Sequence, residues 1–584
     1  MELVEMSGGE VVAKMLSIEG VDHVFGIIDG TYFGFYSNLR KYGIELISPR
    51  HETSAAHMAG AYARVTNKLG VCMASNGPGV ANILPGLVVE QAEGNRVLCI
   101  TSARRTGISY PDRGGTYQYF NQTATIKQFA KWSEAVPSFD RIPEMLRMAL
   151  RKCFEGRPGV VHLDIPENIM NTKVRCEINF WEPHQYRMIE LPKASQYQVE
   201  RAAQLLKSAE FPIIHAGSGV LHAGAKQELT EVAESLQAMV TTSWAGRGAM
   251  SEENPLMMPM VHIEANNNVR NDADVVLVLG SRLSETDWWG KAPYWNANQK
   301  VIQVDLEPSI LGANKPAELT IQSDIKAFLQ QLLLALATDV APPVDRNRQD
   351  KIEKHLNMKR EHRKKLDEHL ADKARPMNPA QVPSLAQKMF PKNTPLVIDG
   401  GNTAIWTNFY YNVNDEMPVL STFKFGMLGA GVGQALGAAV ACPNSPVLCI
   451  IGDGAMGFHP QEVETAIRNN LHVVYIVLCD KQWGMVKMNQ HFALRPIKTL
   501  LKKTLDPHES INADLGEIRF DLLAQAMGAH GEYVDNPADL EEALKRSIDV
   551  GKCTVIHAEV DPVKHMWAPG LRYFKDMHAE PKGK

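Results

Sequence analysis

Two aspartates directly follow strand-like runs in the last third of the sequence. Asp453 follows the apolar run "VLCIIG", and Asp480 follows "VVYIVLC" 27 positions later. Apolar runs bounded by polar residues are typical of strands buried on both faces of a parallel sheet. The spacing suits one strand–helix–strand unit, which would bring both carboxylates to the same edge of that sheet. Two carboxylates at one sheet edge can bind Mg²⁺, although Gly-Asp-Gly alone is also an ordinary turn.

The residues around Asp453 favour a phosphate as the partner of this cation. Gly452 and Gly454 flank the aspartate, and the segment that follows has helical periodicity. Such a turn lets backbone amides and a helix N-terminus approach a phosphate, which a bare carboxylate would repel. A cation that bridges the phosphate and the two aspartates removes the repulsion. We expect the backbone carbonyl of Gln482 to be a further metal ligand.

Composition excludes several classes of protein. The chain has 584 residues, is 45% hydrophobic and carries a formal charge of -5, which allows about three or four domains. The absence of a basic stripe argues against a nucleic-acid partner, and no apolar run approaches the roughly 18 residues of a membrane span. The N-terminal segment predicts an amphipathic helix rather than a signal peptide. Eight scattered cysteines without a CxxC pair predict free thiols, and a cytoplasmic protein that acts on a small molecule.

Strand-like runs alternate with helical stretches in three blocks, at about residues 1–180, 190–340 and 385–563. This alternation predicts an α/β fold of three consecutive doubly wound parallel-sheet domains. Residues 341–384 are dense in charge and predict a solvated helical linker. Residues 564–584 remain as a C-terminal tail.

Several motifs resemble those of the thiamine diphosphate enzymes of the acetolactate synthase group, and the resemblance covers nearly the whole chain. The Gly-Asp-Gly turn resembles the start of the group's cofactor motif, and "PRHETSAAHMAGAYAR" resembles the segment with its catalytic glutamate. "ASNGPGVANILPGL" resembles its Gly-Pro-Gly loop, "GGNTAIW" its diphosphate segment and "FGMLGAGVGQALGAAVA" its pyrimidine segment. The resemblance implies a pyrimidine-binding domain, a middle domain and a diphosphate-binding domain, in that order.

The resemblance also implies roles for single residues. Glu52 would bond to the pyrimidine N1′ and promote loss of the C2 proton, for which it should be buried and protonated; a helix-cap carboxylate is the alternative. Gln118, beside Tyr117, would touch the reaction intermediate or else lie in a solvated loop. The implied catalytic residues are therefore Glu52, Tyr117 and Gln118, and the implied metal ligands are Asp453, Asp480 and Gln482. The implied cofactor contacts are Glu52, Gly77, Pro78, Asn402, Thr403, Gly426, Leu428, Asp453, Gly454, Ala455, Asp480, Gln482, Trp483 and Gly484.

The implied activity is a thiamine diphosphate- and Mg²⁺-dependent cleavage or formation of a C–C bond next to a carbonyl group, of the 2-oxo acid decarboxylase, carboligase or 2-hydroxyacyl-CoA lyase type. Thr286 and Asn489 stand where acetolactate synthases have an arginine and a tryptophan that help to select the second 2-oxo acid, which argues against ordinary acetolactate synthesis. Other segments resemble oxalyl-CoA decarboxylase and 2-hydroxyacyl-CoA lyase, or sulfoacetaldehyde acetyltransferase. Phosphorolytic acyl transfer and a non-catalytic, cofactor-binding relative are the alternatives.

In this family the glutamate and the diphosphate residues of one site come from different subunits, so the resemblance implies a homodimer or homotetramer with sites at the subunit interface. The middle domain would hold FAD, ADP or nothing, and the tail would be either a lid or an unstructured end. One departure concerns the metal site itself. Cys479 and Asp480 replace the two asparagines that close the family's motif, and the carboxylate still offers a hard oxygen to Mg²⁺.

Overall fold

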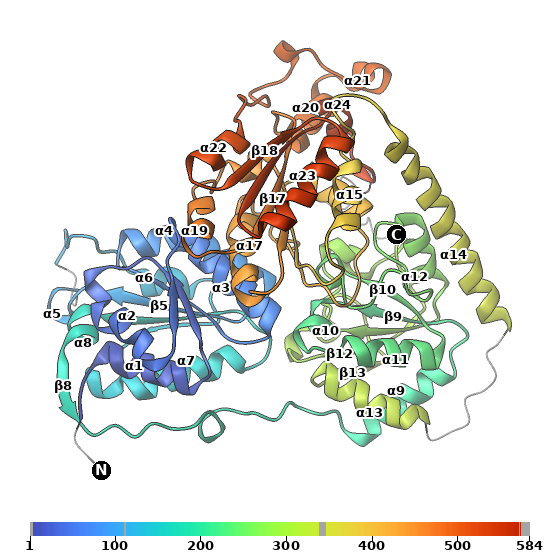
Figure 1. Cartoon of the computed structure of the whole chain (residues 1–584). Helices are drawn as coiled ribbons and strands as arrows, with labels where there is room; N and C mark the ends of the chain where they lie inside the picture. Colours follow the sequence, from blue (N-terminus) through green and yellow to red (C-terminus); the bar gives the residue numbers. More distant parts are fainter. Residues whose placement is uncertain (1–3, 110–112, 338–345, 572, 574–584) are drawn as a thin grey trace.

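The computed structural model describes residues 4–109, 113–337, 346–571 and 573. Three parallel sheets follow one another along the chain, which confirms the predicted α/β fold of three domains. Figure 1 shows the third domain lying between and above the other two. No helix of the described ranges is both long and apolar enough to cross a membrane.

The first domain contains a six-stranded sheet in the order β3-β2-β4-β5-β7-β6. Its strands are β2 (His23–Gly26), β3 (Glu45–Ile47), β4 (Gly70–Ala74), β5 (Val97–Ala103), β6 (Trp132–Ala135) and β7 (Val160–Pro166). Its helices are α1 (Gly8–Ile18), α2 (Phe33–Leu39), α3 (Glu52–Thr66), α4 (Pro78–Glu93), α5 (Thr106–Ser109), α6 (Gln122–Lys127), α7 (Ile142–Phe154) and α8 (Glu167–Asn171). Apolar residues in consecutive positions of β4, β5 and β7 are buried, as expected for strands covered on both faces.

The middle domain has a five-stranded sheet in the order β10-β9-β11-β12-β13. The strands are β9 (Pro212–Ala216), β10 (Met239–Thr242), β11 (Val275–Leu279), β12 (Lys300–Asp305) and β13 (Leu319–Gln322). The helices are α9 (Gln196–Lys207), α10 (Ser218–His222), α11 (Lys226–Leu236), α12 (Ile263–Asp272) and α13 (Ile325–Ala337). Helix α14 (Arg346–Asp367) then leads along one edge of the molecule to the third domain (Figure 1).

The third domain has a six-stranded sheet in the order β15-β14-β16-β17-β19-β18. The strands are β14 (Leu396–Asp399), β15 (Val419–Leu420), β16 (Val447–Gly452), β17 (Val473–Cys479), β18 (His530–Val534) and β19 (Thr554–Glu559). The helices are α15 (Gln381–Met389), α16 (Asn402–Tyr410), α17 (Ala430–Ala441), α18 (Asp453–Met456), α19 (Glu462–Arg468), α20 (Gly484–Leu494), α21 (Pro496–Lys502), α22 (Phe520–Ala526), α23 (Pro537–Val550) and α24 (Pro562–Met566).

The first and third sheets have the same topology. In each, the strands of the domain stand in the order second, first, third, fourth, sixth, fifth. Helices α3 and α17, which follow the second strand of each sheet, pack directly against each other. A Cβ on Gly437 would lie 2.3 Å from the Met58 carbonyl oxygen, and one on Gly433 would lie 2.9 Å from the His57 Cβ. The glycines of α17 therefore allow the backbones of the two domains to approach each other closely.

The structure corrects three boundaries. The N-terminal segment, predicted as helix from its start, contains strand β1 (Val4–Ser7) before α1, because this strand pairs antiparallel with β8 (Lys173–Cys176). The third domain begins before residue 385, because Met377 is buried and forms a bridge with Val560. It also continues past residue 563 through α24.

The structure agrees with the predicted linker helix but not with the predicted start of the C-terminal tail. Helix α14 is the predicted charged linker helix, and it buries only His355 and Leu366 fully. The predicted tail does not begin at residue 564, because His565, Met566 and Leu571 are buried. Residues 572 and 574–584, to which the lid hypothesis applies, lie outside the described residues.

Candidate active site

Asp453 and Asp480 meet at one edge of the third sheet, as predicted. Strands β16 and β17 are parallel neighbours, with Gly452 opposite Leu478. Asp453 is one residue past Gly452 and Asp480 two residues past Leu478, so both lie at the same edge of the sheet. The Asp453 carboxylate accepts hydrogen bonds from the amides of Gly454 at 2.7 Å and Lys481 at 2.8 Å. Burial, and then the charge of Asp480, raise the pKa of Asp453 to about 6. A divalent cation between the two carboxylates would remove this repulsion.

Asp480 is 6% exposed and is held by two side chains. Its Oδ2 accepts from His565 Nδ1 at 2.6 Å and from Gln482 Nε2 at 2.9 Å. The other ring nitrogen of His565 lies 3.1 Å from the Thr403 hydroxyl. His565 was not predicted as a site residue, because a single histidine in a tail-like segment carries no spacing signal. Gln482 was predicted to bind metal through its backbone carbonyl, which stays a prediction; its side chain also donates to the Pro562 carbonyl at 2.7 Å.

Glycines keep the space beside these aspartates open. A Cβ on Gly484 would lie 2.6 Å from Asn402 Nδ2, and one on Gly454 would lie 2.7 Å from the Trp483 ring. The side-chain oxygen of Asn402 is buried and has no hydrogen-bond partner among the residues that the structure describes. When this amide is turned over, its NH₂ group takes the place of the oxygen and can donate to a bound phosphate.

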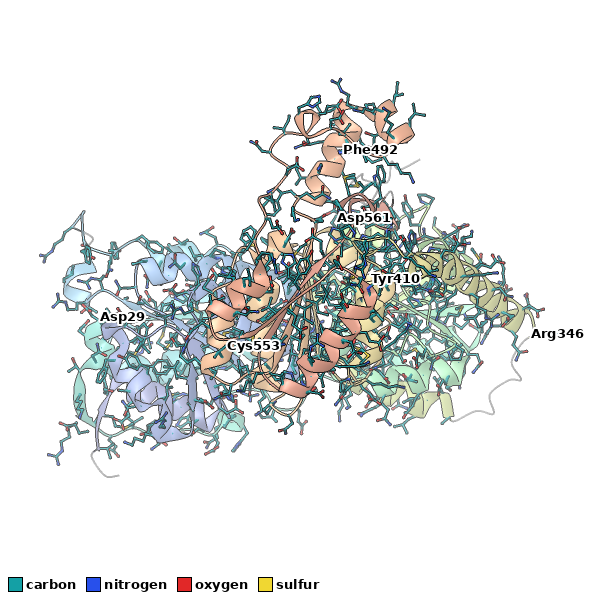
Figure 2. The ribbon with its side chains drawn as sticks, turned by 45° about the horizontal axis from the view of Figure 1, so that its top comes forward. Asp29, Arg346, Tyr410, Phe492, Cys553 and Asp561 are labelled. Atoms are coloured by element: carbon teal, nitrogen blue, oxygen red, sulfur yellow. The ribbon has the colours of Figure 1, made fainter. Side chains whose placement is uncertain are left out.

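The third domain therefore assembles most of the predicted diphosphate site. The predicted residues that lie together there are Asn402, Thr403, Asp453, Gly454, Ala455, Asp480, Gln482, Trp483 and Gly484. A cavity of about 610 Å³ opens beside them and is lined by Asp453, Gly454, Gly457, Phe458, Trp483, Leu515, Gly516, Glu517, Ile518 and Phe520. Figure 2 shows Asp561, just before α24, below the projecting α20–α21 segment that Phe492 marks. The donor set and the open cavity fit a diphosphate with its cation.

The pyrimidine segment lies at the rim of the same cavity. Gly426 has a φ of +70°, and Leu428, two residues later, is partly buried against the core that joins the first and third domains. A Cβ on Gly429 would lie 2.5 Å from the Cβ of Phe458, which lines the cavity. The amides of Lys424 and Phe425 both donate to a carboxylate oxygen of Glu93 at the end of α4, which fixes the start of this segment to the first domain.

Glu52 begins α3, directly after its N-cap residue His51. Asn82 Nδ2 donates to its carboxylate at 3.0 Å, and a Cβ on Gly79 would lie 3.5 Å from its Oε1. The expectation of full burial is wrong for the single chain, in which Glu52 is only partly buried. Its described hydrogen bond stays within the first domain, so its carboxylate is covered from one side only.

Gly77, Pro78 and Gln118 lie beside Glu52 in the first domain. Gly77 has a φ of +66°, and a Cβ there would lie 2.5 Å from the Gln118 carbonyl oxygen, so the loop and the Gln118 backbone are in contact. Pro78 begins α4. The Gln118 side chain is exposed, and Tyr117 is 75% exposed. In the single chain both side chains therefore match the solvated-loop alternative.

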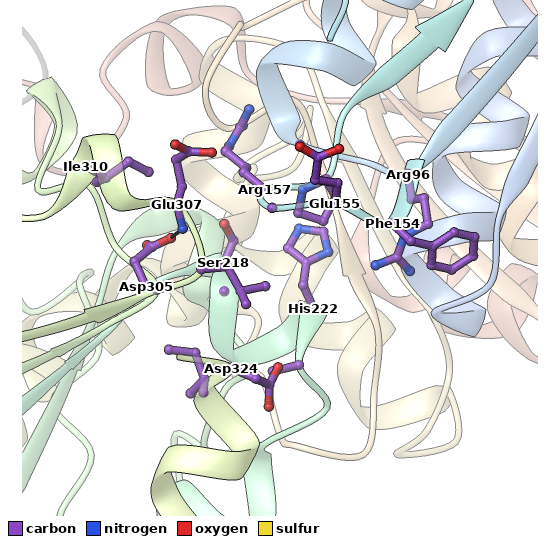
Figure 3. A pocket seen from close by; sticks show the side chains of 18 of the residues that line it. Arg96, Phe154, Glu155, Arg157, Ser218, His222, Asp305, Glu307, Ile310 and Asp324 are labelled. Atoms are coloured by element: carbon purple, nitrogen blue, oxygen red, sulfur yellow. Dashed lines mark hydrogen bonds between the residues drawn. The ribbon is translucent and has the colours of Figure 1, made fainter. Parts of the chain in front are cut away.

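A second cavity, of about 1150 Å³, lies where the three domains meet. Figure 3 shows Ser218, at the start of α10, and Asp305, at the end of β12, from the middle domain, and Arg157 from the first domain. Ser218 and Asp305 stand at the carboxyl ends of strands, where open parallel sheets bind ligands. The glycines next to Ser218, in "HAGSGV", have a packing role, since a Cβ on Gly217 or Gly219 would lie within 2.6 Å of the Gly280 backbone.

Charged side chains of both signs line this second cavity. Its cations include Arg157, Arg282 and Lys424, its acids include Glu93, Asp305 and Glu307, and Thr286 also lines it. Burial, followed by the charges of Arg157 and Arg282, lowers the pKa of Lys424 to about 7. An anionic ligand would compensate these charges. Asn489 lies elsewhere, exposed on α20.

The fold and the paired aspartates define a three-domain α/β protein with a candidate phosphate and cation site at the edge of its third sheet. Three family models of thiamine pyrophosphate enzymes match the chain. The N-terminal TPP binding domain matches residues 6–125, the central domain matches residues 199–332, and the C-terminal TPP binding domain matches residues 399–558. The chain belongs to the thiamine pyrophosphate enzyme family, and it is acetolactate synthase-like.

Curated relatives cover almost the whole chain. A probable acetolactate synthase large subunit of Methanocaldococcus jannaschii is 28% identical over 99% of this chain and 96% of its own length. A sulfoacetaldehyde acetyltransferase of Alcaligenes xylosoxydans xylosoxydans is 28% identical over 94% of this chain and 92% of its own length. The acetolactate synthase isozyme 3 large subunit of Escherichia coli is 26% identical over 97% of both chains. These matches confirm the family resemblance predicted from the motifs.

Proposed function

We propose that the chain is a thiamine diphosphate- and Mg²⁺-dependent enzyme that cleaves or forms a C–C bond next to a carbonyl group. The observation that carries the proposal is the convergence of Asp453, Asp480 and Asn402 on one glycine-lined cavity at the carboxyl ends of paired strands. Thiamine diphosphate, when bound, supplies a nucleophilic carbon and an electron sink. The two aspartates, with Gln482 as a further candidate ligand, would hold the cation, and the backbone amides at the start of α16 would donate to the diphosphate.

Glu52 acts from the other half of the site in this proposal. Its carboxyl group holds a proton and donates it to the pyrimidine ring, and Asn82 orients it through the 3.0 Å hydrogen bond. The partial exposure of Glu52 in one chain supports an assembly in which a second copy covers it. Tyr117, at 75%, Phe425, at 48%, and Phe458, at 51%, are all exposed next to the two half-sites. Exposed apolar side chains of this size are typical of subunit interfaces, which supports a homodimer or homotetramer.

The decisive experiment is a calorimetric titration with thiamine diphosphate in the presence and absence of Mg²⁺, followed by NMR measurement of C2 proton exchange. The wild type binds the cofactor only with Mg²⁺ and accelerates the exchange. Glu52→Ala binds but loses the acceleration, and Glu45→Ala, an exposed acid of the same domain, behaves as wild type. No binding to the wild type rejects the proposal, and binding without accelerated exchange favours the non-catalytic relative.

The substrate follows from a product screen. Thr286 and Asn489, in place of the arginine and tryptophan, argue against ordinary acetolactate synthesis. The similarity to sulfoacetaldehyde acetyltransferase supports the phosphorolytic alternative. We therefore compare pyruvate, sulfoacetaldehyde with phosphate, and 2-hydroxyacyl-CoA esters by mass spectrometry. Acetyl phosphate formed only with sulfoacetaldehyde and phosphate assigns the acyl transfer, whereas acetolactate from pyruvate assigns the ordinary synthase.

We also propose that the cavity of about 1150 Å³ binds an adenine nucleotide, either FAD or ADP. Arg157, Arg282 and Lys424 supply charge for phosphates, and Asp305 at a strand end suits ribose hydroxyls. Visible absorbance of the purified protein identifies FAD, and calorimetry with ADP tests the other nucleotide. Arg282→Ala weakens binding, whereas Arg201→Ala, on α9 of the same domain, leaves it unchanged. Binding of neither nucleotide selects the third alternative, a purely structural middle domain.

A further inference from the structure

His565 reaches the candidate metal site from the last described helix. It lies on α24, 85 positions after Asp480, and its side chain is 4% exposed. Its two ring nitrogens contact two different residues of the site. Nδ1 lies 2.6 Å from Asp480 Oδ2, and Nε2 lies 3.1 Å from the Thr403 hydroxyl oxygen.

The chemistry of the partners fixes the direction of these hydrogen bonds. A carboxylate only accepts, so the proton of the imidazole is on Nδ1 and is donated to Asp480. In the neutral imidazole with this tautomer, Nε2 accepts from the hydroxyl of Thr403. Gln482 points its NH₂ group at Asp480 for the same reason, because its second partner, the Pro562 carbonyl, also only accepts.

Both donors use the same oxygen of Asp480. His565 and Gln482 bond to Oδ2, so Oδ1 stays available for a cation. An asparagine at this position would direct its NH₂ group toward two donors whenever its oxygen faced the cation. An acid avoids this conflict, because one carboxylate oxygen accepts both hydrogen bonds while the other binds metal.

We propose that His565 is a positioning residue for the metal ligand Asp480, and that the His565–Gln482 donor pair is the reason for an acid at this position. The inference rests on the proposed function. Residues that orient a metal ligand by hydrogen bonds change metal affinity when they are lost, typically about 10–100-fold. The backbone of His565 has a separate structural role, since its carbonyl accepts from Trp406 Nε1 at 2.9 Å, and a side-chain substitution retains this bond.

Two substitutions separate the two nitrogens. The side-chain amide nitrogen of His565→Asn occupies roughly the place of Nδ1 and retains the hydrogen bond to Asp480. That of His565→Gln extends to the place of Nε2, so it retains the contact with Thr403 and loses the one with Asp480. His369→Ala is the matched control, because His369 packs on Trp406 at 5.7 Å between ring centroids, in the same neighbourhood as α24.

The experiment measures the Mg²⁺ dissociation constant by calorimetry in the presence of saturating thiamine diphosphate, with the melting temperature of each metal-free variant as the folding check. We expect His565→Asn and His369→Ala to stay within about threefold of wild type, and His565→Gln and His565→Ala to weaken Mg²⁺ about 10–100-fold. Equal affinities of the Asn and Gln variants overturn the inference even if His565→Ala does not fold. A wild type that fails to bind Mg²⁺ and cofactor rejects the proposed function, and the inference with it. A wild type that binds, with all variants equal to it, rejects the inference alone.

Discussion

Gly454→Ala tests most directly whether the cavity beside Asp453 binds the cofactor. The new Cβ would lie 2.7 Å from Cζ3 and 3.1 Å from Cε3 of the Trp483 ring, whereas carbon atoms in good contact are about 3.5–4.0 Å apart. The ring must therefore move by about 1 Å. Its backbone cannot follow freely, because the Trp483 amide donates to the Ala513 carbonyl at 2.8 Å.

Overpacking of this kind costs about 1–3 kcal/mol, and the displacement also moves the Gly454 amide that holds the Asp453 carboxylate. If the strain is relieved only when the site opens, the affinity for thiamine diphosphate with Mg²⁺ falls about 5–150-fold. Gly516→Ala is the control, since Gly516 lines the same cavity and a Cβ there meets no atom within 4 Å. Calorimetric titration and melting temperature measure both variants. Equal behaviour of Gly454→Ala and Gly516→Ala would refute the packing argument.

Three further predictions concern the aspartates and the assembly. Asp480→Asn weakens cofactor and Mg²⁺ binding by no more than about tenfold, because the His565 imidazole can change tautomer and accept from the new NH₂ group, so that only the hydrogen bond from Gln482 is lost. Asp480→Ala weakens both strongly in calorimetry, and equal tolerance of alanine would remove Asp480 from the metal site. Burial raises the pKa of Asp164 from an ordinary value of 3.8 to about 6. The stability that this carboxyl group contributes is therefore present below pH 3.8 and is lost as the pH rises through 6, a difference of about 3 kcal/mol. Asp164→Asn, which still accepts a hydrogen bond from Thr101, should raise the melting temperature at pH 8 but not at pH 4. Co-expression of Glu52→Ala with Asp480→Ala should restore about a quarter of the wild-type sites if each site spans two subunits, and no recovery of activity would place both residues of a site in one chain.

The sequence was sufficient to place the two aspartates at neighbouring strand ends, but it did not show which side chains contact them. Asp453 and Asp480 could be placed together because the parallel pairing of two buried strands is local to one strand–helix–strand unit. His565 could not be placed, because its position depends on how α24 packs after the last strand. The side-chain role of Gln482 was missed for the same reason. Hydrogen bonds between distant segments leave no periodic signal in a sequence.

The shared topology of the first and third sheets was also beyond the sequence. Strands alternating with helices predict a parallel sheet, but the strand order is set by which crossovers pack, so two orders fit the same pattern. The shared strand order of the two sheets shows that Glu52 and the pyrimidine segment occupy corresponding places in the first and third domains. Glu52 begins the helix after the second strand in the first sheet, and the pyrimidine segment precedes the corresponding helix in the third.

The acid at position 480 changes how the diphosphate must be held. Two ionised carboxylates, from Asp453 and Asp480, balance the two charges of Mg²⁺, whereas an amide in place of one of them leaves a net positive charge for the phosphate. Binding therefore depends more on neutral donors than it would beside an amide ligand. The N-terminal amides of α16 and the buried side chain of Asn402 are the groups placed to supply them.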